Sequence, residues 1–248
     1  MFMHDGKILV CGGGYNEEKC LQLIHGTWKK HSTLNEKRIR HSTVTTQIGT
    51  FIFGGFYSDN TYEYLPKDSV KWLKGRTIIP KGFYGGCAIA VKSDQEIWLI
   101  GGQRTERRIL SFDVKNRTFQ VLPWQLNVKR LGHRCTFIPN TNKIMVTGGK
   151  NSGSYLDSTE IIDPENGSVT MASPMKSKRS GHGIGVITIN GEDRLAVFGG
   201  EEQSDTPENV ELYNHRLERW ETTDIILKEP KSYFGFMSLK LSDVISKL

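Results

Sequence analysis

Long apolar runs are missing from this sequence. No stretch of its 248 residues approaches the roughly 18 to 20 consecutive apolar residues that a membrane helix needs. The first seven residues, Met-Phe-Met-His-Asp-Gly-Lys, contain no charged region followed by an apolar stretch, so we expect no secretory signal. We therefore expect a cytoplasmic protein that does not enter a membrane.

Cysteine is scarce as well. The four cysteines are Cys11, Cys20, Cys87 and Cys135, and no pair has the spacing of metal ligands. Each stands among apolar or β-forming residues, so we expect reduced, buried thiols in an intracellular protein. A Cys11–Cys20 bridge between neighbouring strands is the alternative.

The motifs of several enzyme classes are also missing. We find no nucleophile elbow for acyl transfer and no glycine-rich loop of the kind that cradles phosphate. We expect no catalytic activity and no cofactor.

A short β-forming run that ends in two glycines is present, and it recurs along the chain. The copies are Lys7–Gly13, Thr50–Gly55, Glu96–Gly102, Lys143–Gly149 and Arg194–Gly200. Their first glycines are 42, 47, 47 and 51 residues apart. A strand repeated at such a period is typical of a repeat protein, in which no unit buries its apolar face alone. The pattern predicts a single domain over residues 1–248.

Each unit divides into four strands, A to D, with the glycine pair closing strand B. In the second unit these are His41–Ile48, Thr50–Gly55, Thr61–Tyr64 and Ser69–Leu73. The sequence starts at a strand B and ends with a spare A-like strand, Tyr233–Leu241. We expect that strand to complete the first unit and close a ring, which removes exposed sheet edges. The predicted blades are residues 232–242 with 1–33, then 38–77, 81–125, 130–175 and 179–225.

These units resemble the kelch repeat, which has the glycine pair, an aromatic residue in strand C and a tryptophan-like residue in strand D. The resemblance covers Lys7 to Leu241. It implies an all-β fold, a kelch-type β-propeller with five four-stranded blades. Familiar members have six or seven blades, so part of a longer repeat array is the alternative to a five-bladed ring.

The resemblance also implies a binding face, where the loops from D to A and from B to C emerge together. Three residues before each strand A is a basic residue: Arg38, Lys81, Arg130, Arg179 and Lys231. Kelch domains that capture acidic peptides use arginines in this region, and arginine grips carboxylates in bidentate fashion. The alternative is that these cations pair with glutamates such as Glu160 and Glu211 and stabilise the fold.

The loops from B to C differ between units, as expected of a partner-specific surface. Tyr57, Arg104 and Tyr155 lie in them and complete the predicted binding site. We expect a monomeric protein-interaction module that binds an acidic peptide or loop, and that serves as a substrate-recognition adaptor. The alternatives are a sugar-directed isomerase or oxidase on the same scaffold, and a cytoskeletal (actin) contact protein.

His41, His133 and His182 share one repeat position, near the start of strand A. We expect a structural role for them and no metal. The net charge of +6 comes without an aromatic stacking stripe, so we do not expect nucleic-acid binding.

Two short sequence patterns match known signals, one for N-glycosylation and one for targeting to an organelle. Asn116-Arg-Thr118 and Asn166-Gly-Ser168 match the N-glycosylation pattern, but without a signal peptide we expect them to stay unmodified. The last residues, Ser246-Lys247-Leu248, match the peroxisomal address, which makes the peroxisome the alternative location.

Overall fold

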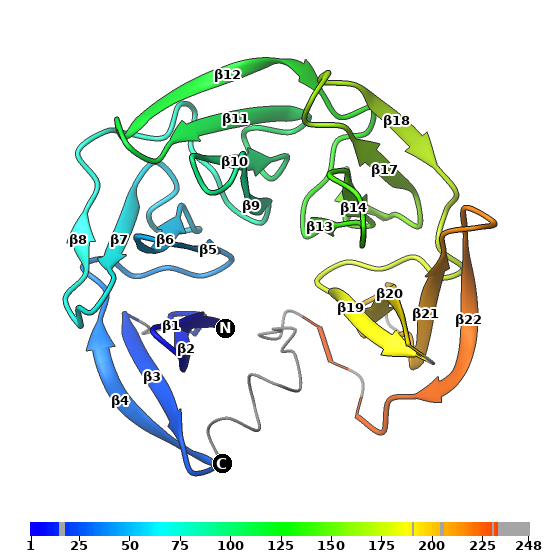
Figure 1. Cartoon of the computed structure of the whole chain (residues 1–248), viewed down its shortest axis with the longest axis horizontal. Helices are drawn as coiled ribbons and strands as arrows, with labels where there is room; N and C mark the ends of the chain where they lie inside the picture. The colour runs from blue at the N-terminus through cyan, green and yellow to red at the C-terminus, as the bar shows by residue number, and fades with distance from the viewer. Residues whose placement is uncertain (15–17, 190, 204–205, 230, 233–248) are drawn as a thin grey trace.

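Short strands separated by glycine-rich turns form five antiparallel sheets around one axis (Figure 1). The structure is a computed structural model, and it describes residues 1–14, 18–189, 191–203, 206–229 and 231–232. The strands are β1 (Phe2–His4), β2 (Lys7–Cys11), β3 (Lys19–Ile24) and β4 (Thr27–Thr33) in blade 1; β5 (Ser42–Thr46), β6 (Gly49–Phe53), β7 (Tyr62–Pro66) and β8 (Leu73–Lys74) in blade 2; β9 (Cys87–Val91), β10 (Glu96–Ile100), β11 (Arg108–Asp113) and β12 (Thr118–Gln125) in blade 3; β13 (Arg134–Phe137), β14 (Ile144–Thr147), β17 (Thr159–Ile162) and β18 (Val169–Ala172) in blade 4; and β19 (Gly183–Ile189), β20 (Glu192–Phe198), β21 (Asn209–Asn214) and β22 (Arg219–Ile226) in blade 5.

The predicted five-bladed propeller is confirmed. Each blade has four strands in sequence order, with the first strand innermost and the last at the rim (Figure 1). The inner strands β1, β5, β9, β13 and β19 follow one another around the axis. A small extra hairpin, β15 (Lys150–Asn151) with β16 (Ser154–Tyr155), lies in the loop after β14.

The first blade differs from the expectation. We expected no inner strand before Lys7 and a contribution from Tyr233–Leu241 instead, but β1 pairs with β2, with Phe2 opposite Leu9 and His4 opposite Lys7. The inner position is therefore filled by residues at the start of the chain. The predicted closing strand at Tyr233–Leu241 lies outside the described residues.

The repeated glycine pair has a steric cause, which Gly148 and Gly149 illustrate. Their φ angles are +60° and +98°, a region that favours glycine. A Cβ at Gly148 would overlap the carbonyl oxygen of Arg179 in the next blade. The Gly149 N–H donates a 2.7 Å hydrogen bond to that same oxygen. The pair thus ends the strand and joins neighbouring blades.

The core consists of apolar layers between the blades. All five residues of β6 and all four of β14 are buried. One layer between blades 2 and 3 joins Phe51 and Phe53 to Phe112, with ring centroids 5.6 and 5.2 Å apart. Burying a side chain of this size stabilises the fold by about 1.5–3 kcal/mol, so packing between blades holds the ring.

The cysteines are not four reduced thiols, and that expectation was wrong. Cys11 and Cys20 form one disulfide, as the alternative had it, and Cys87 and Cys135 form a second. Cys11 and Cys20 lie opposite each other in β2 and β3. Cys87 and Cys135 lie in β9 and β13, the inner strands of two neighbouring blades. The fold brings this second pair together across 48 residues of sequence.

Candidate binding face

Three of the predicted binding residues, Arg38, Arg130 and Arg179, are buried. Their side chains are no more than 1% exposed, so they are not accessible to a partner in this structure. Their placement in a binding site was therefore wrong, and the alternative of a structural ion pair with a glutamate is the one observed.

The guanidinium of Arg130 forms a closed network inside blade 4. Its Nε lies 3.0 Å from Oε1 of Glu160, and its Nη1 donates to the carbonyl oxygens of Gly148 and Ser158 at 2.8 and 2.7 Å. Glu160 in turn accepts a 2.6 Å bond from the backbone N–H of Asn127. Burial lowers the pKa of the Arg130 guanidinium, and Glu160 opposes that shift. The pair fixes the loop that leads into β13 against strands β14 and β17.

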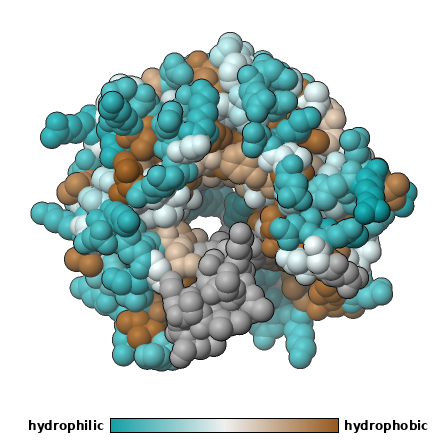
Figure 2. Space-filling view, viewed as in Figure 1, coloured by the Kyte–Doolittle hydropathy of each residue, from teal (hydrophilic) through white to brown (hydrophobic). Residues whose placement is uncertain are grey.

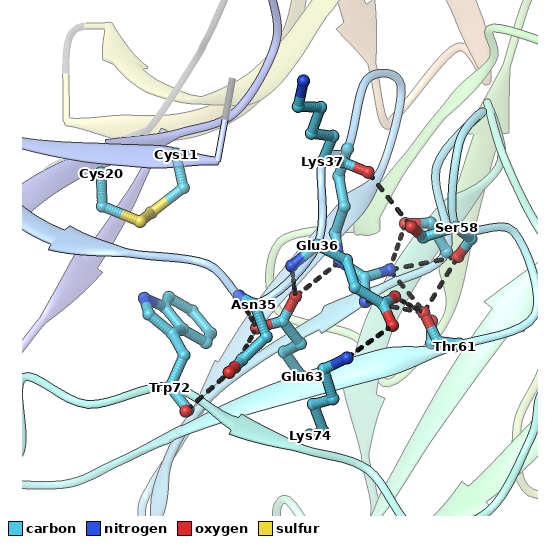
Figure 3. Close-up of polar contacts among 12 residues, drawn as sticks. Cys11, Cys20, Asn35, Glu36, Lys37, Ser58, Thr61, Glu63, Trp72 and Lys74 are labelled. Atoms are coloured by element: carbon cyan, nitrogen blue, oxygen red, sulfur yellow. Dashed lines mark hydrogen bonds and ion pairs between the residues drawn. A yellow bond between two sulfur atoms is a disulfide. The ribbon is translucent and has the colours of Figure 1, made fainter. Parts of the chain in front are cut away.

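Blades 2 and 5 repeat this network. Arg38 pairs with Glu63 at 3.1 Å, and Arg179 pairs with Glu211 at 3.1 Å. Figure 3 shows Glu63 extending from its strand towards Asn35 and Glu36, with Asn35 also donating to the carbonyl oxygen of Trp72. Because the same residues meet in three blades, we assign them to the scaffold.

Blade 3 replaces the network by apolar residues. The carbonyl of Phe83 accepts the N–H of Gly55, just as the carbonyl of Arg130 accepts that of Gly102. Phe83, and not Lys81, therefore takes the arginine position. Leu110 takes the glutamate position on β11, and both residues belong to the buried layer between blades 2 and 3. The repeat alignment that placed Lys81 with the arginines was two residues out of register.

The other predicted site residues lie at the surface. Lys81 is exposed, Tyr57 is 51% exposed, and Arg104 forms a 2.8 Å ion pair with Asp59. Lys231 is exposed beside Glu229, and its carbonyl accepts the N–H of Gly200 as the arginines do. The half-buried Tyr155 lies under the Lys150 ammonium, 4.1 Å from the ring centroid.

Two of these residues, Lys81 and Arg104, meet at one pocket on the loop face of blade 3. It encloses about 410 Å³. Its lining contains five cations, Lys81, Arg104, Arg107, Arg108 and Lys129, and one carboxylate, Glu106. The Lys129 ammonium lies 2.8 Å from Glu106 and holds the pKa of that carboxyl below its usual value.

Three of these cations, Arg107, Arg108 and Lys129, were missed from the sequence. Arg107 and Arg108 follow Arg104 closely in the run Arg104-Thr-Glu-Arg-Arg108, and this local density of arginine was the available signal. Their side chains are half-buried, and Arg107 Nε donates to the carbonyl of Leu126 at 2.6 Å. Lys129 comes from the next loop, so only the fold brings it to the pocket.

An exposed aromatic pair lies near this pocket. Phe56 and Tyr57 are 56% and 51% exposed and pack edge to face. Phe56 also contacts the ring of Tyr84, with centroids 5.7 Å apart. Asp59, which binds Arg104 in the pocket, belongs to the same loop. Phe56 was missed from the sequence because exposure of a single aromatic residue is not visible there.

Two of the three repeated histidines, His133 and His182, lie where blades meet. His182 Nε2 lies 2.7 Å from Thr147 Oγ1, and His133 Nε2 lies 3.0 Å from the carbonyl of Ile100. Each therefore contacts the preceding blade. Burial lowers the pKa of His41 and His133 to about 3. Within the described ranges, no cluster of His, Cys, Asp or Glu has the geometry of a metal site.

A second cavity opens into the centre of the ring (Figure 2). It encloses about 530 Å³ and is lined by residues of all five blades, with Arg40 and Arg134 as its charged side chains. Among the described residues that line it, none is acidic.

The described part of the chain contains no helix that is long and apolar enough to cross a membrane.

Comparison with known proteins supports the fold. Residues 132–176 match the family model of the kelch motif. Those residues form blade 4. No curated protein matches the chain significantly in sequence. Among solved structures, the chain is similar to YjhT with a TM-score of 0.76, over 94% of this chain and 84% of that one, at 14% sequence identity.

Proposed function

We propose that this chain, a kelch-type β-propeller of five blades, is a non-enzymatic protein-interaction module that binds an acidic segment of a partner on its loop face. The single observation that carries the proposal is the pocket lined by Lys81, Arg104, Arg107, Arg108 and Lys129. Five cations there face two carboxylates, Glu106 and Asp59. The surplus positive charge favours an anionic ligand.

The neighbouring aromatic residues indicate how such a segment would be held. Tyrosine and arginine are enriched among the residues that contribute most to protein interfaces. Phe56 and Tyr57 offer an exposed apolar surface beside the cations. A carboxylate in the pocket and an apolar side chain on Phe56 would together fix an extended peptide. An adaptor that presents such a partner to other proteins fits this arrangement.

The proposal is tested with labelled peptides in which glutamates flank one phenylalanine, against matched peptides with glutamine in place of glutamate. We expect the wild type to bind only the acidic set, with affinity that falls as salt rises. The variant Lys81→Ala/Arg108→Ala should bind about tenfold more weakly, a loss of about 1.4 kcal/mol.

Two further variants make the result specific. Lys231→Ala removes an exposed cation away from the pocket and should leave binding unchanged. Arg40→Ala/Arg134→Ala removes the cations of the central cavity. Peptide binding that is lost only in this last variant would place the anion site in the channel. Equal binding of acidic and neutral peptides would overturn the proposal.

A further inference from the structure

The two disulfides indicate the kind of cellular compartment in which this protein matures. All four cysteines of the chain are paired, and the described residues contain no free thiol. Cys87 and Cys135 clamp two neighbouring blades, and both line the central cavity together with Cys11. Disulfides form and persist in oxidising compartments and are rare in the reducing cytosol. The pairing of every cysteine therefore favours an oxidising compartment.

Two asparagines with the N-glycosylation pattern occupy equivalent places in neighbouring blades. Asn116 lies in the turn between β11 and β12 of blade 3, and Asn166 lies in the turn between β17 and β18 of blade 4. Both are exposed, and so are the hydroxyl residues of the two patterns, Thr118 and Ser168.

Each turn is anchored by the residue that follows its asparagine. Arg117 lies over the rings of Phe51 and Tyr64 of blade 2, 4.6 and 4.3 Å from their centroids. Gly167 lies so close to Trp124 of blade 3 that a Cβ would overlap that ring. In both turns this residue has a positive φ, +59° and +73°. The middle residue thus faces the preceding blade, and the asparagine is exposed to solvent.

The side-chain amides of these asparagines make contacts only within their own turns, as far as the described residues extend. Asn116 Nδ2 donates to Asp113 at 3.0 Å, and Asn166 Nδ2 donates to Asp163 at 3.4 Å. Asn166 Oδ1 accepts the backbone N–H of Ser168 at 2.9 Å, which brings the hydroxyl residue next to the amide. Both surface hydrogen bonds are readily exchanged for water, so each Nδ2 is accessible to a transferase.

We infer that Asn116 and Asn166 are acceptor sites for N-linked glycans in a protein that matures in an oxidising secretory compartment. The co-reactant is an oligosaccharide on a polyprenyl pyrophosphate carrier. A bond forms between Nδ2 and C1 of the first sugar, and the bond from C1 to the pyrophosphate oxygen breaks. The amide proton passes to a base of the transferase, and polyprenyl pyrophosphate leaves. The inference departs from the expected cytosolic location and from the expectation that both asparagines stay unmodified.

The inference is independent of the proposed binding function. Strands alternate in direction within a blade, so the turns from C to D lie on the face opposite the loops from B to C. The glycans would cover that opposite face at blades 3 and 4 and would leave the pocket at Lys81 accessible.

The test uses the protein isolated from the cells that make it, unfolded in denaturant and alkylated there before any reductant is added. Mass spectrometry of its peptides should find alkylated cysteines only after reduction. Treatment with a peptide N-glycosidase in heavy-oxygen water should convert Asn116 and Asn166 to labelled aspartate. Asn140, which has Asn142 at the third position, is the internal control and should stay unlabelled. Alkylation without prior reduction would overturn the compartment, and intact disulfides with unlabelled asparagines would overturn the glycan sites.

Matched variants produced in the same cells separate glycan loss from misfolding. Thr118→Ala and Ser168→Ala should each remove one step of the mobility shift on gels, whereas Thr118→Ser and Ser168→Thr should keep it. Both residues changed are exposed, so melting of the four deglycosylated variants should be the same. An unaltered shift in both alanine variants would also overturn the assignment.

Discussion

Three arginines of this ring bind glutamates in the interior, and blade 3 has neither residue at the matching positions. Where blades 2, 4 and 5 bury an arginine with a glutamate, blade 3 buries Phe83 and Leu110. The exchange extends to a third position: Asn127 donates its backbone N–H to Glu160, whereas Pro80 at the matching place has no N–H to donate. The residues of the network therefore change together. A buried ion pair and a well-packed apolar pair of similar volume are comparably stable.

At this scale we predict the outcome of Arg130→Ala. The substitution leaves the Glu160 carboxylate buried without its cation, so the free energy of unfolding should fall by about 3–5 kcal/mol. Urea denaturation measures the change. Arg104→Ala, which removes an exposed arginine, is the control and should alter stability by less than about 0.5 kcal/mol.

A second variant tests whether apolar residues can replace the arginine–glutamate network in blade 4. Asn127→Pro/Arg130→Phe/Glu160→Leu copies blade 3 into blade 4 and should recover most of the stability that Arg130→Ala loses. If Arg130→Ala unfolds at the same urea concentration as the wild type, the arginine is not structural.

At the scale of elements, the start of each inner strand determines how blades meet. A histidine precedes β5, β13 and β19, and in blades 4 and 5 its ring fits against the first glycine of the preceding blade. A Cβ at Gly101 would lie 2.7 Å from the His133 ring, and one at Gly148 would lie 2.9 Å from that of His182. The histidine and the glycine pair are therefore one packing unit.

This packing predicts a loss of stability in acid. Burial lowers the pKa of His133 to about 3 in the folded protein, whereas an unfolded histidine has a pKa of about 6.5. Above that value both states are neutral. As the pH falls from 6.5 towards 3, the His133 imidazole binds a proton in the unfolded state but not in the folded state. Stability should therefore fall by up to about 1.4 kcal/mol per pH unit for each such histidine.

The comparison of wild type with His133→Gln isolates one histidine. Urea denaturation at pH 7.5 and at pH 5.0 gives the free energy of unfolding at each pH. Its fall between the two should be smaller in the variant by about 2 kcal/mol. Other titrating groups contribute equally to both proteins and cancel. An equal fall in the free energy of unfolding of wild type and variant would show that His133 takes up its proton in the folded state.

At the scale of the whole molecule, the two disulfides constrain very different lengths of chain. Cys11 and Cys20 are 9 residues apart, whereas Cys87 and Cys135 are 48 apart. A cross-link that closes a longer loop removes more entropy from the unfolded chain. Replacing Cys87 and Cys135 by alanine should therefore cost about 1.5 kcal/mol more than replacing Cys11 and Cys20.

Thermal melting of the two double variants, each beside the oxidised wild type, measures this difference. Each variant retains the other disulfide, so reductant should lower its melting temperature further. Equal losses in the two variants would show that the longer loop is already restrained in the unfolded chain.

The ring was predictable from the sequence because its signal is local and repeated. A β-forming run that ends in two glycines recurs five times, and that pattern alone indicates five blades. The glycine pairs recur in the sequence because each pair adopts positive φ angles, which are unfavourable for other residues. The aromatic residue in strand C and the tryptophan-like residue in strand D supported the resemblance to the kelch repeat.

The site depended on information that only the tertiary structure contains. Arg130 and Lys81 both stand before an inner strand, yet Arg130 is buried and Lys81 is exposed. In blade 3 the arginine position belongs to Phe83, two residues after Lys81, and no local pattern in the sequence shows this shift. Cys87 and Cys135 pair because their blades are neighbours, and Lys129 reaches the pocket of Arg104 from another loop. Periodicity along the chain determines which residues form strands. Burial and charge pairing depend on contacts between residues far apart in sequence, and these are decided only when the ring is assembled.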